Sequence, residues 1–335
     1  MMSLASSSSR FGRCGFAALW LVVATLGPGR ASAAEPTARP VARPVIRPVI
    51  HLVASIAPLA MIAKRLGGDR VEVRALLPVG ADPHTFELRP SDATAVADAD
   101  VVLLLGSSMD EWLSAAMTGS NNAIVVRLDA IAGEDGHDEH AGHGHGEGEH
   151  DPHVWLDPTW VRDRAIAPIH RALNAADPEG ASHYGVAARA MAEETADLEM
   201  KLENKFLSAE TRSFLAWHPA WQGFAKRFGL HSVGNVGEAS AGEPSLKAVV
   251  AAVRVAGAAK VRAILVEPQI DPRLASVLAD ELRIPLVTVD PLGDLQSLDR
   301  STYELLMIYN GNAFGRALGV LEKREPREPP ISAIP

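Results

Sequence analysis

The sequence predicts an α/β fold of two lobes with mostly parallel sheets, joined by one long bridging helix, with a cleft between the lobes. Short apolar segments alternate with helix-patterned segments twice, in residues 50–126 and again in residues 213–289. Residues 101–105 form a continuous apolar run, which is typical of a central parallel strand buried on both faces. Between the two halves, residues 159–207 carry an almost continuous helical pattern.

The amino-terminal end has the layout of a secretory signal peptide. Arg10 and Arg13 supply a positive region, and the apolar run 15–26 that follows is shorter than the ~20 residues that a membrane-spanning helix needs. Small residues around Ala33 form a cleavage signature. We interpret residues 1–33 as a cleavable signal peptide and expect a periplasmic product without a lipid anchor.

Composition restricts the chemistry of the remaining chain. The net charge of −9 argues against nucleic acid as a partner, because phosphates attract basic surfaces. Cys14 is the only cysteine and lies in the signal peptide, so a bound metal must use nitrogen and oxygen ligands. Residues 34–49 contain a proline at every fourth position, which predicts an extended linker.

Residues 50–158 form the expected N-terminal lobe. Its strands and helices, in chain order, are predicted at residues 51–54, 58–66, 71–77, 92–99, 101–105 and 123–126. The lobe includes an acidic, histidine-rich loop at residues 132–152, which has no apolar periodicity.

Residues 159–208 are predicted to be the bridging helical segment, long enough to join two lobes at 1.5 Å per residue. The C-terminal lobe is expected at residues 209–320, followed by a polar tail at residues 321–335. Its strands and helices are predicted at residues 213–217, 231–233, 245–258, 263–266, 272–282 and 286–289.

Four side chains occupy similar places in this pattern. His84, His218 and Asp290 each follow a predicted strand, and His153 stands where the histidine-rich loop returns to ordered structure. Ligands of open α/β sheets bind at the carboxyl ends of strands, so these side chains are expected to face the cleft, two from each lobe. A proline adjoins each one and stiffens its backbone. A lone histidine is more often a surface or structural residue, and no local motif links these four.

Several segments that carry these residues resemble the zinc- and manganese-binding proteins of ABC importers, the ZnuA-like group. The matching segments are residues 80–92, 151–158 (Asp-Pro-His-Val-Trp-Leu-Asp-Pro), 217–221, 229–230, 243–245 and 289–293. The resemblance implies two α/β lobes bridged by one long helix, with the metal between them. It also implies that His84, His153, His218 and Asp290 are the metal ligands. Residues 222–224, Gln-Gly-Phe, depart from the usual pattern of the group.

The donor set favours Zn²⁺ as the bound ion. Three imidazoles and one carboxylate suit tetrahedral zinc, whereas manganese prefers more oxygen ligands. The resemblance agrees, because manganese-binding members commonly carry glutamate where this chain has His218. Trp155 and Trp217 adjoin ligands and are expected to exclude water, and Glu267 is a candidate partner of the ligands. The loop histidines are expected to form an auxiliary, low-affinity metal loop: His137, His140, His143, His145 and His150.

We therefore expect a monomeric binding protein that captures zinc in the periplasm and delivers it to the permease of an ABC transporter in the inner membrane. It is not expected to be an enzyme, because a catalytic zinc keeps one position open whereas Asp290 can close the shell. The alternatives are a manganese or iron importer component and a metal-dependent adhesin on the same scaffold. A zinc hydrolase, with Asp290 or Glu267 as general base, is a further alternative.

Overall fold

The computed structural model describes residues 49–117, 122–128, 151–237 and 244–320. The first half of this chain forms a four-stranded sheet with the order β2-β1-β3-β4, in which every pairing is parallel. Its strands are β1 (Ile50–Ala54), β2 (Val71–Ala75), β3 (Val101–Leu104) and β4 (Ile124–Arg127). The chain leaves β1 toward one side and returns to β3 on the other, which creates a crevice at the carboxyl ends of these two strands.

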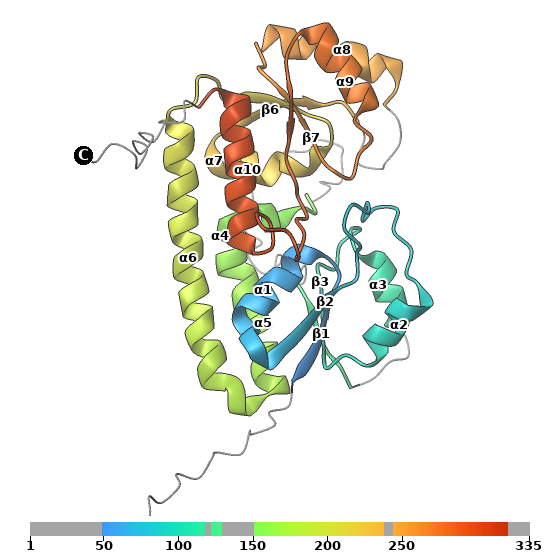
Figure 1. Ribbon diagram of the computed structural model, residues 1–335, viewed down its shortest axis with the longest axis vertical. Coiled ribbons are helices and arrows are strands. Elements are labelled where there is room, and N and C mark those ends of the chain that lie inside the picture. The colour runs from blue at the N-terminus through green and yellow to red at the C-terminus, as the bar shows by residue number, and fades with distance from the viewer. Residues whose placement is uncertain (1–48, 118–121, 129–150, 238–243, 321–335) are drawn as a thin grey trace, which may run out of the picture. The chain divides into compact units, whose positions relative to one another are not determined.

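The second half repeats the same arrangement with the order β6-β5-β7-β8, again parallel throughout. Its strands are β5 (Ser213–Ala216), β6 (His231–Asn235), β7 (Ile264–Val266) and β8 (Leu286–Thr288). The two sheets confirm the predicted α/β fold of two lobes (Figure 1).

Helices cover both faces of the first sheet, which explains the continuous apolar run at β3. Val101 and Leu103 belong to the main hydrophobic core, whereas Val102 and Leu104 belong to a smaller core on the opposite face. The helices of this half, listed in chain order, are α1 (Ala57–Gly67), α2 (Pro90–Ala97), α3 (Glu111–Ala116), α4 (Pro158–Trp160) and α5 (Ile166–Ala176).

The bridging segment differs from the almost continuous helix expected over residues 159–208. After α4 comes a single π-helical turn, then α5, which contacts β3 and β4 and therefore belongs to the N-terminal lobe. The helix α5 ends before Asp177, because Pro178 has no N–H group with which to continue its hydrogen-bonded pattern. The carboxylate of Asp177 accepts a hydrogen bond from Gly180 N in the turn that follows. The helix α6 (Ala181–Leu207), 27 residues and about 40 Å long, contacts both lobes.

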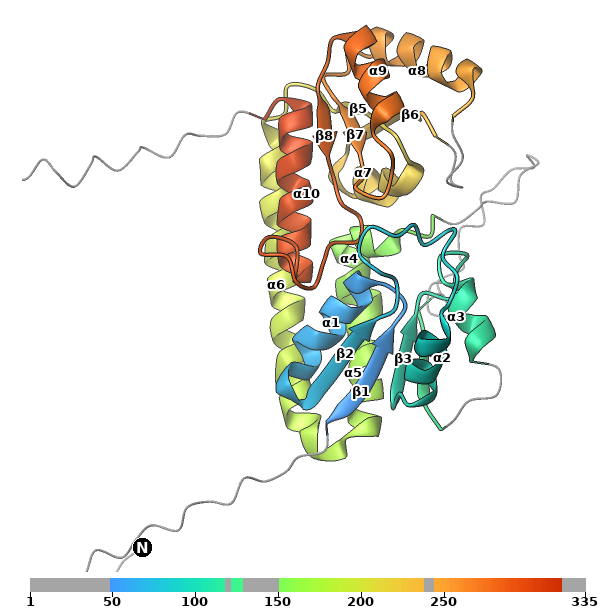
Figure 2. The ribbon, with the colours of Figure 1, turned by 45° about the vertical axis from the view of Figure 1, so that its right-hand side comes forward.

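A second helix, α10 (Tyr303–Leu318), lies beside α6 and was not predicted from the sequence. Thr302 caps it by accepting a hydrogen bond from Leu305 N. Figures 1 and 2 show α6 and α10 side by side along the lobes, and the two helices are in direct contact. The remaining helices are α7 (Gln222–Phe228), α8 (Leu246–Ala258) and α9 (Arg273–Leu282).

The main hydrophobic core continues from the first sheet, along α6, to the inner face of the second sheet. It includes a cluster of aromatic rings with mostly edge-to-face contacts, in which Phe314 of α10 contacts Phe206, Phe214 and Phe224. The helices α8 and α9 cover the outer face of the second sheet with a separate core. Because the lobes share one packed core, we expect them to move only slightly relative to one another.

Several predicted segments lie outside the described residues. They are the signal peptide (1–33), the linker up to residue 48, the loop from residue 132 to residue 150 and the tail (321–335). Within the part of the chain that the structure describes, none of the helices has both the length and the apolar character to cross a membrane.

Candidate metal centre

Three of the predicted ligands come together between the lobes. His84 lies in the loop after β2, His153 precedes a 3-10 turn (Val154–Leu156), and His218 directly follows Trp217 at the end of β5. The ring centroids of His84 and His218 are 5.4 Å apart, those of His153 and His218 are 5.3 Å apart, and those of His84 and His153 are 6.0 Å apart. One nitrogen atom of each ring lies within 4.8 Å of the other two, so the three side chains can share one ion.

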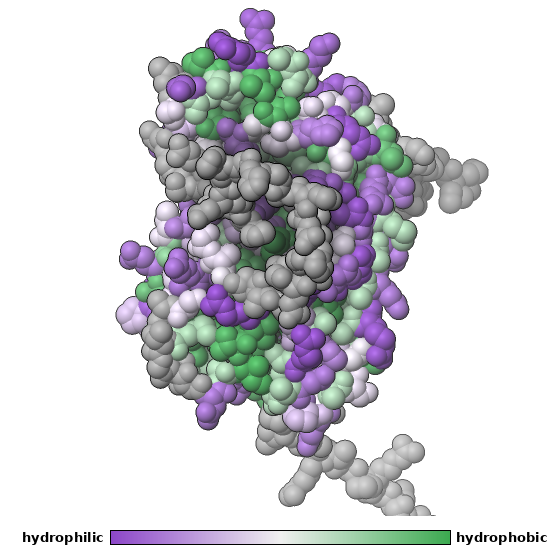
Figure 3. Space-filling model, turned by 180° about the vertical axis from the view of Figure 1, so that it is seen from behind, coloured by the Kyte–Doolittle hydropathy of each residue, from purple (hydrophilic) through white to green (hydrophobic). Residues whose placement is uncertain are grey.

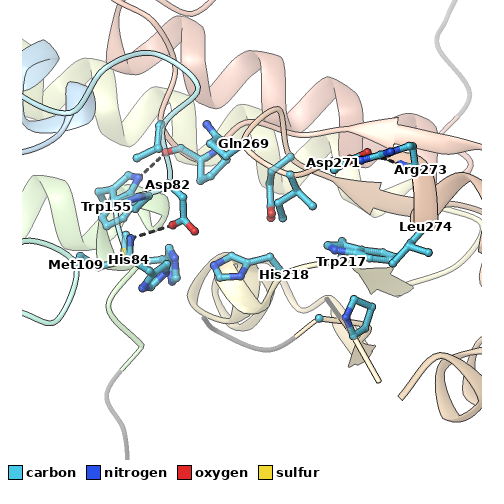
Figure 4. A pocket seen from close by; sticks show the side chains of 18 residues that line it. Asp82, His84, Met109, Trp155, Trp217, His218, Gln269, Asp271, Arg273 and Leu274 are labelled. Atoms are coloured by element: carbon cyan, nitrogen blue, oxygen red, sulfur yellow. Dashed lines mark hydrogen bonds and ion pairs between the residues drawn. The ribbon is translucent and has the colours of Figure 1, made fainter. Parts of the chain in front are cut away.

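His84 is held in place by its own loop. Asp82 Oδ1 accepts a hydrogen bond from His84 N at 2.9 Å, and the carbonyl of Pro83 accepts one from Trp112 Nε1 at 3.2 Å. His84 Nε2 is buried and has no hydrogen-bond partner among the described residues, as expected of a nitrogen that awaits a ligand. Figure 4 shows His84 and His218, from different lobes, facing the same cavity.

Burial lowers the pKa of His84 below its ordinary value. Asp82 opposes this effect, and the neighbouring His153 adds to it. A lowered pKa keeps the imidazole neutral, which is the form that binds a metal.

His153 is the most buried of the three histidines, with 4% of its surface exposed. Asp151 Oδ1 accepts two hydrogen bonds at 3.0 Å, one from His153 N and one from His153 Nδ1. A carboxylate can only accept, so Nδ1 carries the proton and Nε2 is left for a metal. Trp155 packs beside this ring at 5.4 Å between centroids and donates from Nε1 to the carbonyl of Pro291 at 2.7 Å.

Asp290 does not join the three histidines in this structure, contrary to the expectation of four converging ligands. Its Oδ2 forms an ion pair with Arg300 Nη1 at 2.9 Å, and its Oδ1 accepts hydrogen bonds from Leu292 N and Gly293 N at 3.0 Å. The carboxylate is 3% exposed and fixes the turn after β8. It would have to exchange Arg300 for a metal ion before it could act as a ligand.

A cavity of about 400 Å³ adjoins the three histidines, and all three predicted neighbours (Trp155, Trp217 and Glu267) line it. In Figure 3, hydrophobic residues are visible between the two halves of the molecule. The carboxylate of Glu267 is 4% exposed and accepts a hydrogen bond from Trp221 Nε1 at 2.8 Å. Burial, together with the charges of Asp290 and Asp82, raises the pKa of Glu267 to about 8, although the Trp221 hydrogen bond opposes the shift.

The arrangement of the three histidines fits tetrahedral coordination of a metal ion if the distances between their nitrogen atoms become slightly shorter. Zinc bound to imidazole at about 2.0–2.1 Å would hold the ligating nitrogens roughly 3.3 Å apart. The three nitrogens already lie within 4.8 Å of one another, so modest side-chain movement completes the arrangement. Sequence reasoning missed two contributors to the site, Asp151 and Arg300. Asp151 stood in the matched block without an assigned role, and Arg300 belongs to no motif.

The fold and the site together define a two-lobed α/β metal-binding protein. The chain belongs to the family described as zinc-uptake complex component A, periplasmic, whose model matches residues 52–317.

Individual relatives agree with this placement. The chain is 27% identical over 274 residues to the high-affinity zinc uptake system protein ZnuA of Yersinia pestis, covering 75% of this chain and 86% of that protein. A crystal structure of ZnuA matches at 25% identity with a TM-score of 0.69, covering 81% of this chain and 99% of that one. The periplasmic zinc-binding protein TroA of Treponema pallidum shares the fold, with a TM-score of 0.72 at 18% identity and coverage of 81% and 99%.

Proposed function

We propose that this protein captures Zn²⁺ in the periplasm with His84, His153 and His218 and delivers it to the permease of an ABC importer. The observation that carries the proposal is the convergence of three imidazole nitrogens, from two lobes, within 4.8 Å of one another. The names of the relatives, which are zinc-uptake and zinc-binding proteins, support the same ion.

Zinc is preferred over manganese because of the donor atoms. Imidazole nitrogen suits zinc, whereas manganese favours carboxylate, carbonyl and water oxygen. All three side chains that converge here are histidines, including His218. A site whose donors are imidazole nitrogens, one of them from the buried His153, therefore favours zinc over manganese.

The fourth position of the zinc shell is proposed for Asp290, filled only when Arg300 releases Oδ2. In this exchange the buried ion pair with Arg300 is lost and a bond to the metal is formed. Asp290 is therefore proposed to contribute less to the zinc affinity than each histidine does. Three histidines with an open position also resemble a catalytic zinc site. We nevertheless propose binding without catalysis, because the family is an uptake component.

Delivery follows from the division of the ligands between the lobes. His84 and His153 belong to the N-terminal lobe and His218 to the C-terminal lobe. A displacement of one lobe by about 1 Å would stretch metal–nitrogen bonds that are only about 2.0–2.1 Å long. A permease that docks on both lobes could therefore release the ion through a small movement. The five loop histidines lie outside the described residues, and their role as an auxiliary metal loop stays a prediction.

Zinc competition against a chromophoric chelator tests the proposal. His84→Ala and His218→Ala are each expected to weaken the tightest zinc equivalent by more than about 100-fold, which exceeds the effect of losing an outer-shell partner. His231→Ala is the matched control, because His231 is exposed on β6. The zinc affinity of this variant is expected to equal that of the wild type. Arg300→Gln, which frees Asp290, is expected to tighten zinc binding. Unchanged affinity in both ligand variants would refute the site.

A further inference from the structure

Asp151 connects a ligand of one lobe to the backbone of the other. Its Oδ1 accepts hydrogen bonds from His153 N and Nδ1, both at 3.0 Å. Its Oδ2 accepts a hydrogen bond from Gly223 N, also at 3.0 Å, across 72 residues of sequence. The carboxylate is mostly buried, with 21% of the side chain exposed. Within the described part of the chain, its hydrogen bonds are made with these two neighbours.

The contact with His153 decides which nitrogen of the ring is free. A neutral imidazole has one protonated nitrogen and one lone pair, and the two tautomers are close in energy without a partner. The Asp151 carboxylate requires a donor and so selects the Nδ1–H form, which leaves the lone pair on Nε2. Carboxylates that accept from the second nitrogen of a metal-binding histidine fix both its tautomer and its orientation.

The contact with Gly223 holds the segment that carries another ligand. Gly223 lies in the first turn of α7, where backbone N–H groups have no partner within the helix. This turn follows His218 by five residues, through the short 3-10 turn Pro219–Trp221. A Cβ atom at position 223 would lie 3.4 Å from Asp151 Oδ2, so a side chain there would meet the carboxylate at ordinary van der Waals distance.

We propose that Asp151 is a positioning residue for zinc capture, which selects the metal-binding tautomer of His153 and docks the His218 segment against it across the cleft. The inference rests on the proposed function, because it assumes that His153 binds the ion through Nε2. In this proposal, the carboxylate of Asp151 aligns His153 of one lobe with His218 of the other.

The same block of sequence provides a matched control. Asp157 also precedes a proline, and its Oδ1 accepts from Thr159 N at 2.9 Å, just as Asp151 accepts from His153 N. Among the described residues, Asp157 has no hydrogen bond to a histidine ring; its other hydrogen bonds involve the side chain of Thr159 and the backbone of Trp160. Asp157→Asn therefore reproduces the chemical change at a comparable turn while leaving the histidines untouched.

Zinc affinity is measured for the full-length protein and for Asp151→Ala, Asp151→Asn, Asp157→Asn and His153→Ala. Asp151→Ala is expected to weaken binding by about 10- to 100-fold, the usual effect of losing an outer-shell partner. Asparagine keeps one acceptor oxygen but places its amide NH2 group against an N–H donor, either that of His153 or that of Gly223, so the zinc affinity of Asp151→Asn is expected to fall between those of Asp151→Ala and wild type. Asp157→Asn is expected to stay within about twofold of wild type, because it leaves the outer shell of the ligands intact.

A second readout is independent of affinity and of general loss of structure. Long-range ¹H–¹⁵N spectra of histidine side chains, recorded on the metal-free protein, are expected to show His153 as the Nδ1–H tautomer in the wild type and in Asp157→Asn. In Asp151→Ala this preference is expected to be lost. An unchanged tautomer or wild-type affinity in Asp151→Ala, while His153→Ala binds weakly, would overturn this inference alone. Wild-type affinity in His153→Ala would instead overturn the proposed site.

Discussion

At the scale of single residues, burial shifts the pKa of one histidine and of one glutamate in the cleft, each toward its neutral form. Burial lowers the pKa of His84, so the site remains able to bind metal at a pH where an exposed histidine would begin to protonate. Burial raises the pKa of Glu267 to about 8, so this side chain carries a proton at neutral pH in the absence of metal. Both shifts reduce the charge that the empty cleft must hold.

The raised pKa of Glu267 makes the stability of the metal-free protein depend on pH. Between about pH 4.5 and pH 8 the folded state holds a proton that the unfolded state has lost, so the free energy of unfolding decreases as pH rises. Glu267→Gln keeps an acceptor for Trp221 but cannot ionise. Its stability relative to wild type is therefore expected to be greater at pH 8 than at pH 5.

Urea denaturation at the two pH values, with a chelator present, measures this difference. Asp271→Asn is the control, because Asp271 lines the same cavity and is half exposed, with 53% of its side chain accessible. An identical pH dependence in Glu267→Gln and wild type would show that Glu267 is ionised in the folded protein.

Some residues of the site could be predicted from the sequence, and others could not. His84, His153 and His218 could be selected because each stands at the end of a strand or loop that points to the cleft. The partners of Asp290 could not be selected, since Arg300 lies ten residues further on with no pattern that links the two. An ion pair of this kind depends on the path of the loop between them, which the sequence does not display.

At the scale of elements, the contact between α6 and α10 depends on a small residue. Gly311 of α10 is buried, and a Cβ atom there would collide with the side chain of Leu202 on α6. Gly257 of α8 is exposed, and a Cβ atom there would meet nothing within 4 Å. The same substitution is therefore expected to have opposite effects in the two helices.

Gly311→Ala is expected to destabilise the protein by about 1–3 kcal/mol, because it overpacks a filled interface. Gly257→Ala is expected to stabilise it by about 0.5–1 kcal/mol, because alanine loses less conformational entropy in a helix. Chemical denaturation of the metal-free variants measures both values. Equal effects of the two substitutions would contradict the close packing of α6 against α10.

Strands were easier to predict than the helices that join the lobes. Most strands, such as β3 and β7, are short apolar runs next to a turn, and recognising such a run needs no long-range information. The helix α10 was missed because Asn310 and Gly311 interrupt its apolar pattern, although both are buried. Asn310 is satisfied by hydrogen bonds with the backbone of Asp290, a contact that only the folded chain creates. Pro178 explains the break between α5 and α6, but no sequence pattern assigned α5 to the N-terminal lobe.

At the scale of the whole molecule, one hydrophobic core connects two lobes that each contribute ligands. We expect the shared core to keep the lobes in nearly fixed positions, so that the three proposed ligands are close together before an ion binds. Contacts across the cleft, such as those of Trp155 with Pro291 and of Tyr303 with Trp155, serve the same purpose. Under the proposed function, capture would need little reorganisation, and release would need only a small displacement of one lobe.

The most direct test is anomalous diffraction at the zinc absorption edge, from crystals of the protein loaded with one equivalent of zinc. We predict a single strong peak about 2.0–2.1 Å from one nitrogen of each of His84, His153 and His218. A principal peak elsewhere, or one that contacts histidines of only one lobe, would contradict the proposal that ligands from both lobes share one ion.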